Sequence, residues 1–334
     1  MSSSLPAKVL IAGGKPAGGV ASFAEALRCG FGELGIAAEV AAPTQILRRI
    51  GELRDPQVLK ILSLAAVFAA PIARRAICVA HGIPCAKYQG LRTWLAVLGS
   101  LRLAKASRGT QLVAVSSYSA IHLDSVFNLR VDAVIRNTVQ PVFLEPFEQK
   151  DYAREAITYV GRLGRAKNVD KLLLAIRDVL DENGGLRAWI IGDGPMRPEL
   201  DRIAAGDERI ELLGSMTPLQ VRERLRRTRV FASGCPIEAL GIVYLEALSQ
   251  GCAVAMPASG GGLEITPALI GNNIHLFSPS ITREDVAAAL RRSLAAVPEK
   301  VSFEKHSPRT IAEAYLAVDA RLNAQDVLYA EAYT

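Results

Sequence analysis

The sequence predicts an α/β protein made of two Rossmann-like domains, each built on a parallel sheet. Short apolar runs, each followed by a helical pattern, recur along the chain, and this alternation is typical of parallel strands with covering helices. The length of 334 residues exceeds one typical domain and suits two domains of about 150 residues each. Half of the residues are apolar, so a large packed core is expected.

The apolar runs predict a series of strands in each half of the chain. In the first half they are Lys8–Ala12, Ala38–Ala42, Ala76–Ala80, Leu112–Ser116 and Ala133–Ile135. In the second half they are Ile157–Val160, Ala188–Ile191, Ile210–Leu213, Val230–Ala232, Ala253–Met256 and Ile274–Phe277. Two prolines interrupt the periodicity in Pro141–Asp151. We therefore expect domains over 1–146 and 152–306, followed by a final amphipathic segment over 307–334.

Charge and cysteine content exclude several classes of protein. Residues 1–146 carry 16 Lys and Arg against 8 Asp and Glu, a net charge of +8, whereas the remainder carries a net charge of −2. The partner of the first half is expected to be an anionic acceptor or an anionic membrane surface, because no nucleic-acid motif accompanies the charge. The five cysteines show no C-x-x-C spacing, and no signal peptide is recognised at the start. Both observations predict a cytoplasmic protein with reduced thiols.

Residues Gly90–Arg108 form a basic amphipathic segment that has two interpretations. Trp94 and the leucines that follow it could pack into the core of the first domain. Alternatively, the segment could lie on the inner face of an anionic membrane, with arginines at the head groups and the aromatic ring at the interface. The sequence leaves both interpretations open.

The stretch Gly234–Glu264 holds two carboxylates, Glu238 and Glu246, eight positions apart. Apolar residues at three-and-four spacing predict a helix between Gly241 and Gly251, with Glu246 in its second turn. A helix that starts behind a glycine presents free N–H groups and suits a phosphate. Carboxylates beside it suit the hydroxyl groups of a sugar or ribose.

This stretch resembles the donor-site motif of family 4 of the retaining glycosyltransferases, which have the GT-B fold. The family pattern is approximately E-G-F-G-x3-L-E-A-x-A-x-G-x-P-V, followed by G-G-x-x-E. The matching residues are Glu238, Gly241, Leu245, Glu246, Ala247, Leu248, Gly251, Val254, Gly260, Gly261 and Glu264. Ala239 and Leu240 replace the usual Gly and Phe, so the loop around the donor sugar is expected to differ in shape.

Two further segments of the second half resemble the same family. Arg162 and Lys167 match its G-R-x(4–6)-K-G motif, with Asn168 in place of the last glycine. Two cations from one loop can neutralise a diphosphate. The Gly-Asp-Gly turn around Asp193 resembles a segment that lies near the nucleotide base in the family. The resemblance implies that the base packs around Leu213–Met216, which includes Gly214.

The resemblance is weaker in the first half. Gly13, Gly14, Gly18 and Gly19 form a strand-to-helix turn without the G-x-G-x-x-G spacing of a dinucleotide site. In the family, this glycine pair lies beside the donor diphosphate. His81 follows an apolar run, and the resemblance implies that it positions the sugar or the acceptor; a structural histidine is the alternative.

The resemblance implies a fold and a reaction. The final helix would cross back to the first domain, and the site would lie in the cleft between the domains. A sugar would pass from a UDP- or GDP-sugar to a glycan, lipid-linked or small-molecule acceptor, with its anomeric configuration retained. The surface polysaccharides, lipopolysaccharides and glycolipids of bacteria are the expected pathways.

Each candidate residue has a role by the same resemblance. Arg162 and Lys167 would stabilise the departing diphosphate. Glu238 would hold the sugar hydroxyls and Glu246 the ribose hydroxyls. The backbone amides of Gly241, Ile242 and Val243, beside Leu240, and those of 260–263 would complete the donor cradle.

No metal or cofactor is expected, because the sequence contains no Asp-x-Asp motif and cationic side chains can stabilise the leaving group. Three alternatives remain at this point. A nucleotide-sugar epimerase of the same fold would consume no acceptor. A Rossmann oxidoreductase would bind NAD, and an inactive relative would bind sugar nucleotides without turnover.

Overall fold

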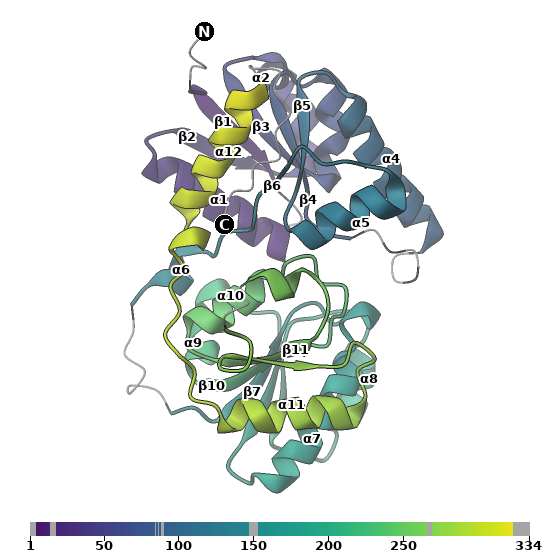
Figure 1. Cartoon of the computed structure of the whole chain (residues 1–334), viewed down its shortest axis with the longest axis vertical. Helices are drawn as coiled ribbons and strands as arrows, with labels where there is room; N and C mark the ends of the chain where they lie inside the picture. The colour runs from purple at the N-terminus through teal and green to yellow at the C-terminus, as the bar shows by residue number, and fades with distance from the viewer. Residues whose placement is uncertain are drawn as a thin grey trace. The chain divides into compact units, whose positions relative to one another are not determined.

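The computed structural model describes residues 5–13, 18–83, 85, 87, 90–146, 153–265 and 269–322. The chain divides into two compact units (Figure 1). The first contains residues 1–141 and 304–334, and the second contains residues 142–303. The chain therefore leaves the first unit once and returns to it for its last segment.

Six parallel strands among the described residues form the sheet of the first unit. In chain order they are β1 (Lys8–Ala12), β2 (Ala37–Ala41), β3 (Val58–Ser63), β4 (Ala76–Ala80), β5 (Thr110–Ala114) and β6 (Ala133–Val134). Their order across the sheet is β2-β1-β3-β4-β5-β6. The order reverses between β1 and β3, so the chain winds outward from the middle of the sheet in both directions.

Strand β3 is absent from the expectations above, and Lys60 explains why. Its side chain interrupts an otherwise apolar run, yet the whole residue is buried in the middle of the sheet. Its ammonium group donates hydrogen bonds to the backbone carbonyls of Asp55 and Arg74, each at 2.5 Å. Burial lowers the pKa of Lys60 to about 8. Local carbonyl groups from two loops thus replace water around a charge that sequence patterns assign to the surface.

The helices of the first unit connect these strands. They are α1 (Gly19–Glu33), α2 (Ile50–Arg54), α4 (Leu91–Ala106) and α5 (Ser117–Phe127), with the 3-10 segments η1 (Pro43–Arg49) and η2 (Leu64–Ile72). The last described helix of the chain, α12 (Pro308–Leu322), packs against α1 (Figure 1). Gly30 of α1 makes this approach feasible, because a Cβ atom there would lie 2.0 Å from the carbonyl oxygen of Pro308.

The second unit repeats the same plan. Its described strands are β7 (Ala156–Val160), β8 (Arg187–Ile191), β9 (Ile210–Gly214), β10 (Thr228–Ala232), β11 (Ala253–Pro257) and β12 (Ile274–Phe277). All pair in parallel, in the order β12-β11-β10-β7-β8-β9. Its helices are α7 (Val169–Glu182), α8 (Arg197–Ala204), α9 (Pro218–Arg226), α10 (Ile242–Ser249) and α11 (Arg283–Ala295), and the short α6 (Pro141–Leu144) lies at the unit boundary.

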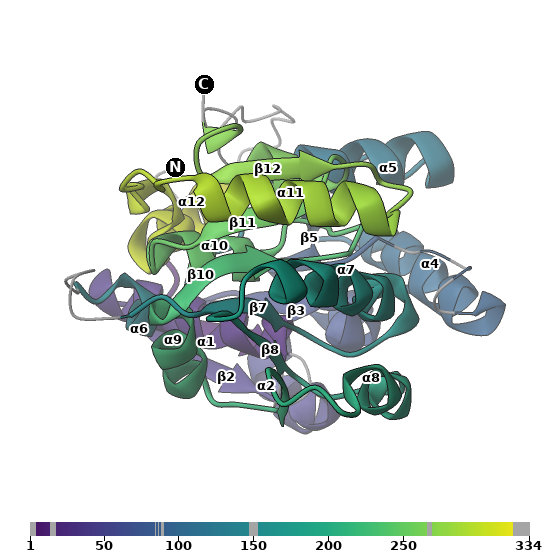
Figure 2. The same ribbon diagram turned by 90° about the horizontal axis from the view of Figure 1, so that it is seen from below.

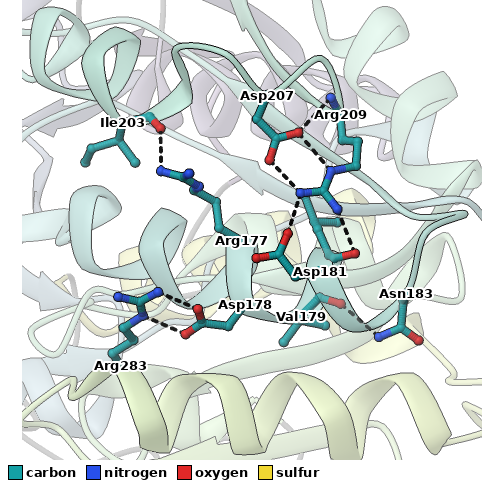
Figure 3. Close-up of polar contacts among 10 residues, drawn as sticks. Arg177, Asp178, Val179, Asp181, Asn183, Ile203, Asp207, Arg209 and Arg283 are labelled. Atoms are coloured by element: carbon teal, nitrogen blue, oxygen red, sulfur yellow. Dashed lines mark hydrogen bonds and ion pairs between the residues drawn. The ribbon is translucent and has the colours of Figure 1, made fainter.

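Helices α7 and α11 lie side by side on one face of this sheet (Figure 2). Their apolar residues share a single buried cluster with inward-facing residues of β7, β8, β10 and β11. Polar contacts on the outer side of α7 add to this packing (Figure 3). Asp178 accepts two hydrogen bonds from Arg283 of α11, and Asp181 accepts one from Arg209 in the turn before β9. The base of the second sheet is therefore firmly held below its carboxyl-terminal edge.

Candidate donor site

The strand order of the second unit defines where a ligand can bind. Strands β7 and β10 are neighbours, and the chain winds in opposite directions on either side of them. In open parallel sheets, ligands bind at the carboxyl ends of the two strands where this reversal occurs. The loop after β7 carries Arg162 and Lys167, and the loop after β10 carries Glu238. The sequence-predicted residues of the second half thus meet at the topological switch point.

The loop after β7 is supported from the side by the Gly-Asp-Gly turn after β8. Leu163 donates its N–H to the carbonyl of Asp193 at 2.9 Å. Gly192 approaches so closely that a Cβ atom there would lie 1.9 Å from the carbonyl oxygen of Gly161. Asp193 accepts a hydrogen bond from the N–H of Gly194 at 2.7 Å, which fits the turn-forming role expected for it.

Asn168 explains one departure from the family motif. Its backbone is left-handed, with φ 44° and ψ 41°, at the residue directly before α7. Asparagine tolerates this conformation better than most residues other than glycine. Its side-chain Nδ2 also donates to the carbonyl of Gly234 at 2.9 Å. The replacement of glycine by asparagine therefore keeps the turn and adds a connection between the two site loops.

The loop after β10 is fixed at several points along its backbone. The Ser259 hydroxyl donates to the carbonyl of Pro236 at 2.9 Å, and the Gly261 N–H donates to the carbonyl of Glu238 at 2.8 Å. A Cβ atom at Gly260, where φ is 81°, would lie 2.8 Å from the same Glu238 oxygen. The Gly260–Gly261 pair is thus required for packing against Glu238. The Gly261 amide is occupied by this bond, which corrects the expectation that it faces the donor.

Lys167 and Glu238 form an ion pair across the two loops. The distance from Lys167 Nζ to Glu238 Oε2 is 2.5 Å, and their side chains are 29% and 22% exposed. Burial alone would lower the pKa of Lys167, but the neighbouring Glu238 carboxylate more than reverses this effect and the pKa is raised. Arg162 is exposed, and its guanidinium has no hydrogen bond or ion pair to another described residue.

The buried thiol of Cys235 lies beside this pair. Burial raises the pKa of Cys235 to about 11, although the Lys167 charge acts in the opposite direction. Cys235 is therefore a neutral neighbour of the site at physiological pH. Neither the Lys167–Glu238 contact nor the position of Cys235 was predictable, because no spacing rule connects loops that follow different strands.

Glu246 lies in the second turn of α10, as predicted, and it is buried with 8% exposure. Burial raises the pKa of its carboxyl group to about 7. No other residue that the structure describes forms a hydrogen bond or ion pair with this carboxyl group. A buried acid without an internal partner is typical of a group that receives its hydrogen bonds from a ligand.

Helix α10 begins behind Gly241, which has φ 83° and a left-handed backbone. A Cβ atom there would lie 2.5 Å from the ring of Tyr244, so the position requires glycine for two reasons. The N–H groups of Ile242 and Val243 donate to no described backbone carbonyl. Leu240, in contrast, is buried with 1% exposure and contributes packing at this turn.

Leu213 and Gly214 end β9, which lies two strands away from β7. Gly214 accepts a hydrogen bond from the Gly192 N–H at 2.7 Å, and Leu213 is half-buried. These residues therefore flank the Gly-Asp-Gly turn at the same edge of the sheet. The structure brings all the predicted donor-site residues of the second half to one edge.

The remaining predicted residues belong to the first unit. Gly18 precedes α1 and Gly19 is its first residue, whereas Gly14 lies outside the described residues. His81 directly follows β4, and its ring contacts Phe23 of α1 edge-on, with centroids 4.6 Å apart. Burial lowers the pKa of His81 to about 4. The imidazole is therefore neutral at physiological pH and can both donate and accept a hydrogen bond.

Two searches of the described part of the chain address metal and membrane chemistry. No three His, Cys, Asp or Glu side chains in it are close enough together to hold a metal ion. None of its helices combines the length and the apolar character needed to cross a bilayer.

The two sheets, their order and the site at the switch point define a GT-B fold. The solved structure of HepE from Anabaena, in complex with UDP and glucose, is similar with a TM-score of 0.65 and 16% identity. That similarity covers 96% of this chain and 99% of HepE. Residues 154–296 match the family described as glycosyl transferases group 1, and through this segment the chain belongs to that family.

Curated relatives match over part of their length. The sulfoquinovosyl transferase SQD2 of Arabidopsis thaliana is 31% identical over 139 residues, which is 41% of this chain and 26% of SQD2. A human phosphatidylinositol N-acetylglucosaminyltransferase protein is 26% identical over 234 residues, 63% of this chain and 48% of the relative. The chain thus spans between about a quarter and a half of the curated relatives that it matches.

Proposed function

We propose that this chain is a retaining, metal-independent glycosyltransferase of family 4 that uses a nucleoside diphosphate sugar. The observation that carries the proposal is the combination of Lys167, Glu238 and the unpartnered, buried Glu246 at the switch point between β7 and β10. A cation suits a diphosphate, and two carboxylates suit two sets of hydroxyl groups on one nucleotide sugar.

The chemistry assigns each residue a step. The bond between the anomeric carbon and the β-phosphate oxygen breaks, and a bond from the acceptor oxygen forms on the same face. The departing phosphate takes the acceptor proton. Arg162 and Lys167 stabilise the charge that develops on the diphosphate, together with the N–H groups at the start of α10. Glu238 holds the sugar hydroxyls, Glu246 holds the ribose diol, and the base packs beside Leu213.

The donor and acceptor follow from relatives only by analogy. HepE was solved with UDP and glucose, and the human relative is named as a phosphatidylinositol N-acetylglucosaminyltransferase. We propose a UDP- or GDP-sugar as donor and a lipid-linked glycan or glycolipid as acceptor, in a bacterial surface-glycan pathway. The neutral imidazole of His81 would position the sugar or the acceptor.

Helix α4 supports a peripheral contact with an anionic membrane on the cytoplasmic side. Its inner face is core, because Leu98 and Leu101 are buried and Trp94 packs against the cluster of the first unit. Its outer face exposes Leu91 and Leu95, at 63% and 52%, among basic residues that include Arg92 and Arg102. The two interpretations of this segment therefore apply to different faces of one helix.

The decisive experiment is thermal stabilisation by UDP, GDP, nucleotide sugars and NAD, each with and without EDTA. Ligand at a hundred times its dissociation constant adds about 2.7 kcal/mol of stability. Stabilisation by UDP or GDP regardless of EDTA is expected, and the preferred base names the donor class. Stabilisation by NAD alone would contradict the proposal and favour an oxidoreductase. Turnover without an acceptor would favour an epimerase, and binding without turnover would favour an inactive relative.

A further inference from the structure

The ligand-free donor site neutralises its own cation. Lys167 is directed at Glu238 with an Nζ–Oε2 distance of 2.5 Å, although a diphosphate would need the same ammonium group. The pair is about three-quarters buried, so solvent screens it only in part. A diphosphate that binds here must therefore compete with an internal carboxylate for Lys167.

Only side chains need to move for this exchange. The Glu238 backbone is held by the Gly261 N–H, and the Lys167 backbone is closely packed, since a Cβ atom at Gly234 would lie 2.8 Å from the Lys167 carbonyl oxygen. Among the described residues, the Glu238 carboxylate has no other ion pair or hydrogen bond. Rotation of the two side chains is sufficient to separate the charges while both loops stay in place.

We propose that the Lys167–Glu238 ion pair is a resting contact that the sugar donor replaces on binding, and that its return expels the nucleoside diphosphate after transfer. This inference rests on the proposed function of the site. A complete donor compensates both charges, because its diphosphate takes Lys167 and its sugar hydroxyls take Glu238. The product compensates Lys167 alone and leaves Glu238 beside a like charge. The site therefore discriminates between the sugar donor and its own product.

Calorimetric titration of wild type and Glu238→Gln tests this discrimination. The probes are UDP and GDP, together with UDP-glucose and GDP-mannose. Glutamine keeps the shape of the side chain and removes the competing charge, so the dissociation constant of the nucleoside diphosphate should fall by about tenfold, or about 1.4 kcal/mol. The nucleotide sugar should gain less, because its hydroxyls lose a charged acceptor. In kinetic assays the variant should show stronger product inhibition.

Glu208→Gln is the matched control, because Glu208 is an exposed acid of the same unit with no polar partner among the described residues. It changes the net charge equally and should leave both constants unchanged. A similar gain in Glu208→Gln would attribute the effect to overall charge and overturn the inference.

Lys167→Met separates failure of the inference from failure of the proposed function. If the diphosphate binds wild type, is lost in Lys167→Met and binds Glu238→Gln no more tightly, the donor site stands and the resting contact is overturned. If no nucleoside diphosphate binds wild type or Glu238→Gln, the proposed function itself is overturned. A gain confined to Glu238→Gln supports both.

Discussion

Asn168 connects the two loops of the donor site through one hydrogen bond, from its Nδ2 to the Gly234 carbonyl at 2.9 Å. Its backbone holds a left-handed conformation with φ 44°. Asn168→Gly should keep this conformation and lose the hydrogen bond, at a cost of about 1 kcal/mol. Asn168→Ala should cost about 1 to 2 kcal/mol more, because alanine also disfavours the left-handed region. Denaturant unfolding of the three proteins measures both; equal losses would contradict the role of the backbone.

The proposed diphosphate contacts predict a large loss of turnover. Arg162→Ala or Lys167→Ala should slow transfer by about 2 to 5 kcal/mol of transition-state stabilisation, because a charge-assisted hydrogen bond to the leaving group is lost. Lys171→Ala removes an exposed cation from the first turn of α7 and serves as the control. Circular dichroism should show an intact fold in all three. Near-normal kcat in Arg162→Ala and Lys167→Ala would remove the site assignment.

Glu246 predicts how donor binding depends on pH. Burial raises its pKa from 4.5 to about 7, so the folded protein binds this proton more tightly than the unfolded chain does. Glu246 therefore lowers stability progressively as pH rises from about 4.5 to about 7, by about 3 kcal/mol in total. The ionised carboxylate is the better acceptor for ribose hydroxyls, so nucleotide affinity should rise through the same region. Calorimetry from about pH 5.5 to about pH 8.5 measures this.

Glu246→Gln is the control for the pH dependence. Glutamine cannot titrate, so nucleotide affinity should become nearly independent of pH in this range and weaker than wild type above about pH 7. His81 should contribute no slope here, because burial lowers its pKa to about 4. An unchanged slope in Glu246→Gln would assign the titration to another group.

The ion pair between Arg75 and Asp319 should stabilise the first unit. Arg75 donates two hydrogen bonds to the Asp319 carboxylate, at 2.8 and 2.6 Å, and the two side chains are only 11% and 3% exposed. Asp319→Ala leaves a buried guanidinium without its counter-ion and should cost about 3 to 5 kcal/mol. Glu313→Ala breaks the exposed Arg309–Glu313 pair on the same helix and should cost less than about 0.5 kcal/mol. Similar denaturation midpoints for the two variants would contradict this difference.

The outer face of α4 gives a prediction for membranes. Leu91 and Leu95 are one turn apart and exposed, so the double variant Leu91→Ser/Leu95→Ser should weaken binding to anionic vesicles by about tenfold or more. Leu219→Ser, at a similarly exposed leucine of the second unit, is the control. Vesicle sedimentation measures both. Equal binding by wild type and the double variant would exclude this face as the contact.

The sequence predicted the strands of both units where apolar runs were uninterrupted, and the GT-B fold is confirmed. It missed β3, because Lys60 satisfies its charge through backbone carbonyls that only the folded loops supply. It located Lys167, Glu238 and Glu246 by motif. It could not predict that the first two pair with each other, because that contact depends on the order of β7 and β10 across the sheet. The loss of polar partners around Glu246 is likewise a property of packing.

The return of the chain to the first unit has a consequence for biosynthesis. Residues 142–303 form a continuous unit, whereas the first unit needs α12, and Asp319 becomes available to Arg75 only late in synthesis. On the ribosome, the second unit can complete its folding while the first still exposes the groove on α1 that receives Pro308. The nascent first unit is therefore the part that needs protection by chaperones, and truncation before residue 308 should leave it a client for proteolysis.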